Sequence, residues 1–180
     1  MITWTSLDQI DADFPETAVT IGKFDGVHLG HVEILRQLSE ISTTRGLKST
    51  VITFDRHPAS LLSPDQLPAD ILSTQDRLAL IEQQNIDASL VLAFDTELAG
   101  LSPRDFVTTI LLGKLNTQVV LVGHDFRFGE NAAGDVATLQ QLGAELGFDV
   151  VLIDDVGAAQ AQLGVDAEFP AYAARPLRTS

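Results

Sequence analysis

The chain has 180 residues, 45% of them hydrophobic and 20% charged, which is the composition of a globular domain large enough to bury a core. Its 25 acidic and 11 basic residues give a formal net charge of −14, and the basic face of a general nucleic-acid binder is missing. There is no cysteine, which excludes disulfides, thiolate catalysis and cysteine-ligated zinc. Without a membrane-spanning apolar stretch or a signal-peptide pattern, we expect a cytoplasmic protein that binds neither membranes nor nucleic acids.

A strand, a glycine-containing turn and a helix are predicted between residues 17 and 45. The strand is the apolar, β-branched run at 18–21, which Gly22 and Gly26 interrupt. An apolar stripe with helical spacing follows, formed by Val32, Leu35, Leu38 and Ile41. Gly46 is a helix stop signal. His28 and His31 would then stand in the turn and at the first helical position.

These two histidines form an H-x-G-H pattern at the predicted start of the helix. A helix start offers free backbone N–H groups and the positive end of the helix dipole, which suits a phosphate. Two imidazoles at this spacing can donate hydrogen bonds to the same anion. We interpret the pattern as an anion site. The alternative is that the glycines serve only the turn and the histidines are ordinary solvated or packed side chains.

The rest of the chain alternates between strands and helices. Short apolar runs predict strands at 48–54, 88–94, 118–122 and 149–153. Capping residues and apolar spacing predict helices at 74–84, 103–112 and 135–146. Residues 59–73 contain two prolines and no clear period, which indicates a loop or flap.

This alternation predicts an α/β fold. Right-handed crossovers would place about five strands in a mainly parallel, Rossmann-like sheet with helices on both faces. Ligands of such sheets bind outside the C-terminal strand ends. The unusual stretches of this sequence fall at those ends, and they read FDGVHLGH, FDRHP, FDTELAG and GHDFRFG.

Three of these stretches, in this order and spacing, resemble the adenylyltransferase module of bacterial FAD synthetases, which belong to the HxGH nucleotidyltransferase superfamily. They are GKFDGVHLGH, TFDRHP and VGHDFRFGENAAGD. The resemblance covers about residues 1–155, so we expect a nucleotidyltransferase domain there and a divergent tail at 156–180. Family members usually carry a C-terminal riboflavin kinase domain, which we do not expect in this chain.

The resemblance implies FMN adenylyltransferase activity, in which the phosphate of FMN attacks the α-phosphorus of Mg·ATP to give FAD and pyrophosphate. ATP and FMN are the implied substrates and Mg²⁺ the implied cation, with no metal ligand assigned in the chain. His28 and His31 would be catalytic, because they would contact the ATP phosphates and stabilise charge in the transition state. Both histidines should then lie at the surface of a cleft. The implied ATP-binding residues are Gly22, Phe24, Asp25, Gly26, His28, His31 and Gly123.

The resemblance also implies a flavin pocket. Its residues would be Phe54, Asp55, His57, Pro58, Phe106, Asp125 and Phe128. Asp125 matches the position that holds the phosphate and metal region in the family. For Phe54 and Phe106, a role as packed core aromatics is the alternative.

The sequence departs from the family in two places. Arg56 replaces the first proline of the usual D/E-P-H-P pattern, and residues 154–180 lack the S-S-T-x-I/V-R motif that clamps the triphosphate. The H-x-G-H pair favours an active enzyme, whereas the missing motif favours a catalytically impaired flavin- or nucleotide-binding relative. A nucleotidyltransferase with another acceptor, such as phosphopantetheine or nicotinamide mononucleotide, is the third alternative. The FDRHP and DFRFG stretches argue against it.

Overall fold

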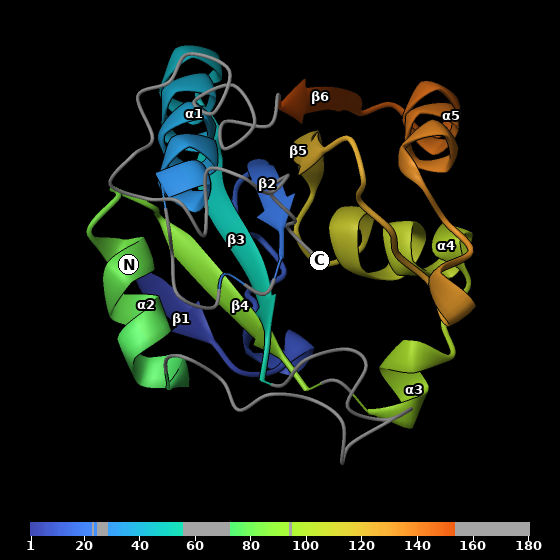
Figure 1. The fold of residues 1–180 in the computed structure, drawn as a ribbon, viewed down its shortest axis with the longest axis horizontal. Coiled ribbons are helices and arrows are strands. Elements are labelled where there is room, and N and C mark those ends of the chain that lie inside the picture. The colour runs from blue at the N-terminus through green and yellow to red at the C-terminus, as the bar shows by residue number, and fades with distance from the viewer. Residues whose placement is uncertain (23, 25–28, 56–72, 94, 154–180) are drawn as a thin grey trace, which may run out of the picture.

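A parallel sheet of six strands forms the centre of the described chain (Figure 1). The structure is a computed structural model that describes residues 1–22, 24, 29–55, 73–93 and 95–153. The strands are β1 (Ile2–Trp4), β2 (Thr17–Ile21), β3 (Lys48–Phe54), β4 (Ala88–Leu92), β5 (Thr117–Gly123) and β6 (Asp149–Ile153). Their order is β1-β4-β3-β2-β5-β6, and every neighbouring pair is parallel. The predicted α/β fold with a mainly parallel sheet is confirmed.

The sheet has one strand that the sequence pattern did not predict. This is β1, a three-residue edge strand in which Ile2 pairs with Ala88 and Trp4 with Leu90. Three residues are too few to show an alternating pattern. The ring of Trp4 is buried and lies edge-on to Phe14, with 4.8 Å between the ring centroids. This aromatic contact fixes the edge strand to the core.

The four central strands are buried along almost their whole length, as expected for a parallel sheet that is covered on both faces. Buried polar groups in β2 have hydrogen-bond partners. Thr17 Oγ1 donates to the carbonyl oxygen of Leu115 at 2.7 Å, and Thr20 Oγ1 donates to that of Leu121 at 2.8 Å. These bonds remove the cost of burying two hydroxyl groups.

Helices cover both faces of the sheet (Figure 1). On one face α1 (Leu29–Arg45) and α2 (Thr74–Glu82) contribute Leu35, Leu38 and Ile81 to an apolar cluster. On the other face the helical elements are α4 (Pro103–Phe106), η4 (Val107–Leu112) and α5 (Val136–Leu146). The shorter elements are η1 (Leu7–Gln9), α3 (Thr96–Ala99) and η5 (Glu130–Ala132). None of the helices in the described ranges is long and apolar enough to cross a membrane.

The predicted helix at 103–112 is present, but it is wound in two ways. It begins with α4, for which Ser102 Oγ accepts from the N–H of Asp105 at 3.0 Å and Pro103 takes the first helical position. It continues as η4, which has π-type winding, and the N–H of Gly113 donates to Thr108 five residues back. Apolar spacing cannot distinguish the two windings over so few residues.

The other predicted helices differ from the structure only at their ends. Helix α1 ends at Arg45, before Gly46 with a φ of 70°, and α5 ends before Gly147 with a φ of 95°. Both glycines adopt the left-handed conformation that favours this residue after a helix. Ser73 caps α2 by accepting from the N–H of Asp76. The rest of the predicted loop, at 59–72, lies outside the described residues.

Candidate active site

The strands that lead into three of the sequence stretches singled out above are neighbours in the sheet. Strand β2 lies between β3 and β5, and the three strands end at Ile21, Phe54 and Gly123. From β2 the chain crosses through α1 to β3 on one side, and from β5 it crosses through α5 to β6 on the other. The helices α1 and α5 lie on opposite faces. The C-terminal ends of β2 and β5 therefore form a topological switch point, the usual ligand crevice of an open α/β sheet.

Gly22 and Phe24 follow the end of β2. The N–H of Gly22 donates to the carbonyl oxygen of Ile52 at 3.0 Å, so the backbone is still paired with β3 at this residue. Phe24 has a φ of 56° and its ring is buried in the cluster beneath α1. A positive φ is uncommon for a bulky residue and is typical of a tight turn that the surrounding packing holds in place.

His31 lies in the first turn of α1, which begins at Leu29. The sequence places this histidine at the first helical position and at the surface of a cleft, but only 4% of it is exposed. The reason is its contact with Phe24, whose ring is 5.0 Å away between centroids at an interplanar angle of 63°. His31 is therefore part of the packing at the helix start as well as a candidate phosphate contact. Among the other predicted residues of this site, Asp25, Gly26 and His28 lie outside the described residues.

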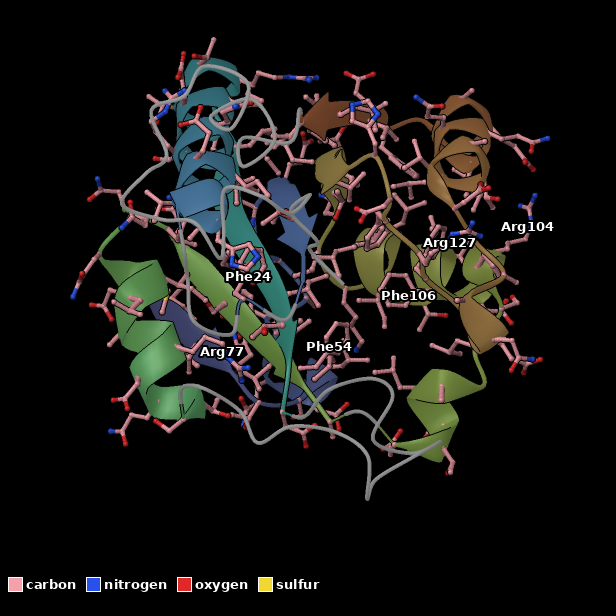
Figure 2. All side chains as sticks on the ribbon, viewed as in Figure 1. Phe24, Phe54, Arg77, Arg104, Phe106 and Arg127 are labelled. Carbon is pink, nitrogen blue, oxygen red and sulfur yellow. The ribbon has the colours of Figure 1, made fainter. Side chains whose placement is uncertain are left out.

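Aromatic side chains gather on the opposite face of the sheet (Figure 2). The ring of Phe128 is stacked on Phe126 with 5.5 Å between centroids and 12° between planes, and it is tilted against Phe106 at 5.9 Å. Phe54, at the end of β3, belongs to the same apolar cluster. All four rings are buried, with Phe54 and Phe128 each 7% exposed. The structure thus brings three of the predicted flavin-pocket residues into one cluster, where they also serve as core.

The segment after β5 is held against α4. Phe128 and Gly134 form a short antiparallel bridge, with N–H to carbonyl distances of 3.0 and 2.9 Å. The N–H of Glu130 donates to the carbonyl oxygen of Leu101 at 2.7 Å. Gly129 has a φ of 80°, and a Cβ there would lie 2.8 Å from Pro103. We call residues 123–135 the β5 loop; these contacts hold its backbone at Phe128, Glu130 and Gly134.

Two carboxylates of the candidate set lie near these strand ends. Asp125 is half-buried in the β5 loop, and Asp55 is exposed directly after β3. The N–H of Asp55 donates to Leu92 at 3.0 Å, so its backbone is still held by β4. His57, Pro58 and the unusual Arg56 lie outside the described residues.

Comparison with known proteins assigns this arrangement to a family. The chain matches the FAD synthetase family over residues 10–165. It belongs to that family. It is 36% identical over 132 residues to the bifunctional riboflavin kinase/FMN adenylyltransferase of Escherichia coli K12, which covers 73% of this chain and 42% of that protein. The protein of the same description from Pseudomonas fluorescens is 40% identical over 137 residues, with the same coverage.

The chain therefore spans less than half the length of these curated relatives. The fold is also shared with a solved structure, the crystal structure of a macrolide-efflux protein from Streptococcus pneumoniae. The TM-score is 0.71 at 22% identity, over 86% of this chain and 50% of that one. At this identity the likeness concerns the fold alone.

Arg77 is a charged residue at the same edge of this FAD synthetase-family sheet that the sequence pattern did not predict as part of the site. Its side chain is fully buried, and Nη2 donates to the carbonyl oxygen of Phe54 at 2.9 Å and to Thr74 Oγ1 at 3.2 Å (Figure 2). It joins α2 to the end of β3. The available signal was its spacing, because Arg77 precedes Ile81 by one helical turn and so shares the buried face of α2.

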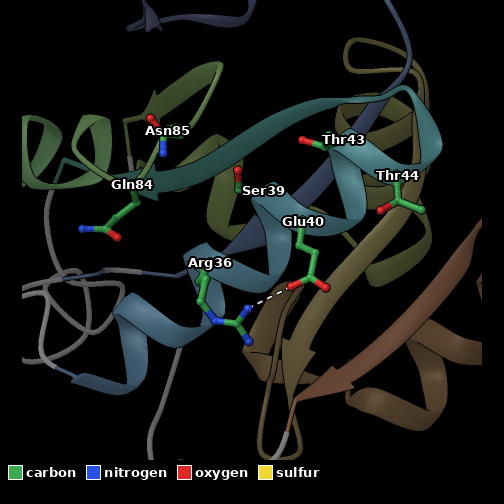
Figure 3. A pocket seen from close by; sticks show the side chains of 7 residues that line it. All are labelled: Arg36, Ser39, Glu40, Thr43, Thr44, Gln84 and Asn85. Atoms are coloured by element: carbon green, nitrogen blue, oxygen red, sulfur yellow. Dashed lines mark hydrogen bonds and ion pairs between the residues drawn. The ribbon is translucent and has the colours of Figure 1, made fainter.

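A polar hollow elsewhere on the surface carries none of the candidate residues (Figure 3). It lies where the later turns of α1 meet the turn before β4. This is at the N-terminal ends of the strands, whereas the motifs follow their C-terminal ends. Arg36 in this hollow is paired with Glu33 at 2.7 Å and with Glu40 at 2.8 Å. The lining residues are Arg36, Ser39, Glu40, Thr43, Thr44, Gln84 and Asn85.

Proposed function

We propose that this chain is an FMN adenylyltransferase, which transfers AMP from Mg·ATP to FMN and releases pyrophosphate. One observation carries the proposal. Three sequence motifs of the FAD synthetase family begin at the ends of β2, β3 and β5, which flank the switch point of the sheet. The family match supports it, because its range, residues 10–165, includes all three motifs, and relatives of the chain are described as bifunctional riboflavin kinase/FMN adenylyltransferases.

In this proposal ATP lies along the turn after β2, with its phosphates at the N-terminus of α1. The helix start supplies backbone N–H groups and a positive partial charge. His28 and His31 add imidazole donors to the phosphates. Burial of His31 against Phe24 removes water from one side of the imidazole, which strengthens a hydrogen bond that it donates.

The flavin ring lies against the aromatic cluster on the other side of the switch point. Phe54, Phe106 and Phe128 offer an apolar wall, and Asp55 and Asp125 offer polar groups at its rim. A ring bound there directs the FMN phosphate toward the ATP phosphates. An oxygen of that phosphate attacks the α-phosphorus, the bond to the β-phosphate bridging oxygen breaks, and pyrophosphate leaves with the electron pair. Such transfers depend chiefly on positioning and on neutralisation of charge.

Magnesium enters this reaction with ATP. This ion binds substrate phosphates, water and one or two carboxylates rather than a cage of protein ligands. Magnesium would supply neutralisation of charge on the triphosphate, and Asp125 would be a carboxylate that helps to hold it.

A catalytically impaired flavin- or nucleotide-binding protein is the second candidate. It is favoured by residues 154–180, which lack the S-S-T-x-I/V-R motif of the family. The two candidates differ in whether FAD forms from FMN, ATP and magnesium, measured by chromatography. The proposed enzyme forms FAD from FMN but forms no dinucleotide from riboflavin, because riboflavin has no phosphate to attack ATP. Saturable FMN binding without any FAD would favour the second candidate.

A further inference from the structure

The position of the Phe128 ring depends on the absence of a side chain at Gly134. A Cβ built on Gly134 would lie 2.7 Å from Cε1, 2.9 Å from Cζ and 3.0 Å from Cδ1 of Phe128. Cβ atoms do not come this close to aromatic carbons. One edge of the Phe128 ring therefore occupies the space that the Cβ of any larger residue at position 134 would need. The two residues also exchange backbone hydrogen bonds of 3.0 and 2.9 Å. The ring and the glycine are therefore fixed to each other.

The ring has little room to move away. It is 7% exposed, and it is stacked on Phe126 at 5.5 Å and tilted against Phe106 at 5.9 Å. Phe126 and Phe106 are themselves 1% and 5% exposed. Close-packed interiors absorb an extra methyl group only by shifting side chains or backbone. A side chain at 134 would thus displace the Phe128 ring or the β5 loop that carries it.

The backbone of Gly134 does not itself require glycine. The described glycines with positive φ are Gly46, Gly129 and Gly147, and Gly134 is not among them. An alanine at 134 is therefore compatible with the local backbone conformation. What excludes it is the contact with Phe128, and this makes the substitution a clean steric test.

We propose that Gly134 is a positioning residue for the flavin: it sets the place of the Phe128 ring and thereby the affinity for the isoalloxazine ring, without touching the ligand. This inference rests on the proposed function, because it takes Phe128 as part of the flavin-facing wall. The ligand class is the flavin ring as such, so FMN and riboflavin respond alike. Mg·ATP binds mainly at the turn after β2 and the start of α1 in this proposal, so its affinity should respond much less to residue 134 than flavin affinity does, although Gly123 and Asp125 belong to the β5 loop.

The test compares the unaltered chain with Gly134→Ala and with the control Ala133→Ser at the neighbouring exposed position. Dissociation constants of FMN and riboflavin are measured by quenching of flavin fluorescence, and that of Mg·ATP by calorimetry. Gly134→Ala is expected to weaken the binding of both flavins by about tenfold, which is the scale of one lost aromatic contact. The affinity for Mg·ATP should fall much less than the affinity for the flavins, and the properties of Ala133→Ser should stay unchanged.

A second variant makes the test independent of folding losses. Phe128→Leu removes Cε1 and Cζ, the two ring atoms that a Cβ at 134 would approach most closely. If Gly134 acts through Phe128, adding Gly134→Ala to Phe128→Leu causes no further loss of flavin affinity. If Gly134→Ala alone does not fold, the double variant should recover a cooperative unfolding transition.

Three results would overturn the inference. The first is unchanged flavin affinity in Gly134→Ala, and the second is an equal loss of flavin and ATP affinity, which indicates general damage. The third is additive losses in the double variant. Should the unaltered chain bind no FMN, the proposed function fails and the inference with it. If the unaltered chain binds FMN and forms FAD while any of the three results is found, only the inference fails.

Discussion

The imidazole of His31 lies edge-on to the ring of Phe24, with 5.0 Å between the ring centroids. The contact joins the first turn of α1 to the residue that turns the chain after β2. A candidate catalytic group is thereby also part of the buried packing. For substitutions of His31, the effects on stability and on activity must therefore be measured separately.

The first prediction separates these two roles of His31. His31→Ala removes the ring from a site that is 4% exposed, and it should lower the free energy of unfolding by about 1–3 kcal/mol as well as the rate of FAD formation. His31→Gln keeps much of the volume and a hydrogen-bond donor, so it should cost less stability while still slowing the reaction. Urea unfolding and initial rates are the measurements. A His31→Gln variant with full activity would contradict the phosphate-contact role.

A large share of the fold could be predicted from the sequence, because its signals are local. The strands β2 to β5 are buried on both faces and appear as short runs rich in apolar and β-branched residues, and Gly46 and Gly147 mark helix ends. The edge strand β1 has only three residues and gives no such signal. The π-type winding of η4 also leaves no trace in the apolar spacing.

The site could be predicted as far as the strand ends, since motifs at the C-terminal ends of parallel strands must share one edge. Its packing could not. His31 is buried because it packs against the ring of Phe24, seven residues earlier. The backbone turns at Phe24 with a positive φ. The role of Gly134 depends on where the Phe128 ring falls, which only the bridge between the two residues shows.

The second prediction concerns the buried guanidinium of Arg77. Arg77→Met keeps most of the volume but removes the donor to the Phe54 carbonyl and to Thr74. It should destabilise the chain by about 2–4 kcal/mol, because a buried acceptor loses a charged donor. FMN affinity should fall too, since Phe54 lies in the candidate flavin wall. Equilibrium unfolding and flavin titration are the measurements.

Arg36→Met is the matched control for this substitution. Its two ion pairs with Glu33 and Glu40 are exposed to solvent, so their loss should change stability little. Equal effects of the two methionine variants would contradict the anchoring role of Arg77. The stability of the conservative variant Arg77→Lys should lie between that of Arg77→Met and that of the unaltered chain, because lysine keeps the charge but not the planar guanidinium group.

The third prediction is a pH dependence at the start of α5. The carboxylate of Asp135 accepts from the N–H and the hydroxyl of Thr138, both at 2.9 Å, and these bonds lower its pKa below the ordinary value of an aspartate. A lowered folded-state pKa means that the stabilisation is complete above the unfolded value and is lost as the pH falls through the folded value. Asp135→Asn keeps a capping oxygen that does not titrate.

The measurement is the melting temperature of both proteins between neutral pH and about pH 3, which brackets the unfolded value of an aspartate. The unaltered chain should be the more stable one at neutral pH. Its advantage over Asp135→Asn should shrink below the unfolded pKa. A difference that stays constant over this range would show that Asp135 does not stabilise the folded chain through its charge.

The fourth prediction concerns the two substrates. Residues 154–180 lack the hydroxyl and arginine motif that clamps the triphosphate in the family, and such charged contacts contribute about 1.5–3 kcal/mol each. We therefore expect Mg·ATP to be the weakly bound substrate, FMN to be bound normally, and turnover to be slow. The dissociation constants and the forward rate test this. Tight ATP binding together with fast turnover would show that the motif is dispensable.

The most direct test of the central claim follows the phosphates of ATP through the reaction. The chain is incubated with FMN, magnesium and ATP labelled either at the α-phosphate or at the γ-phosphate. The account predicts that the α-label appears in FAD and the γ-label in pyrophosphate, in equal amounts and only when FMN is present. An α-label that stays in ATP, or a γ-label released as orthophosphate, would contradict the assignment of this chain as an FMN adenylyltransferase.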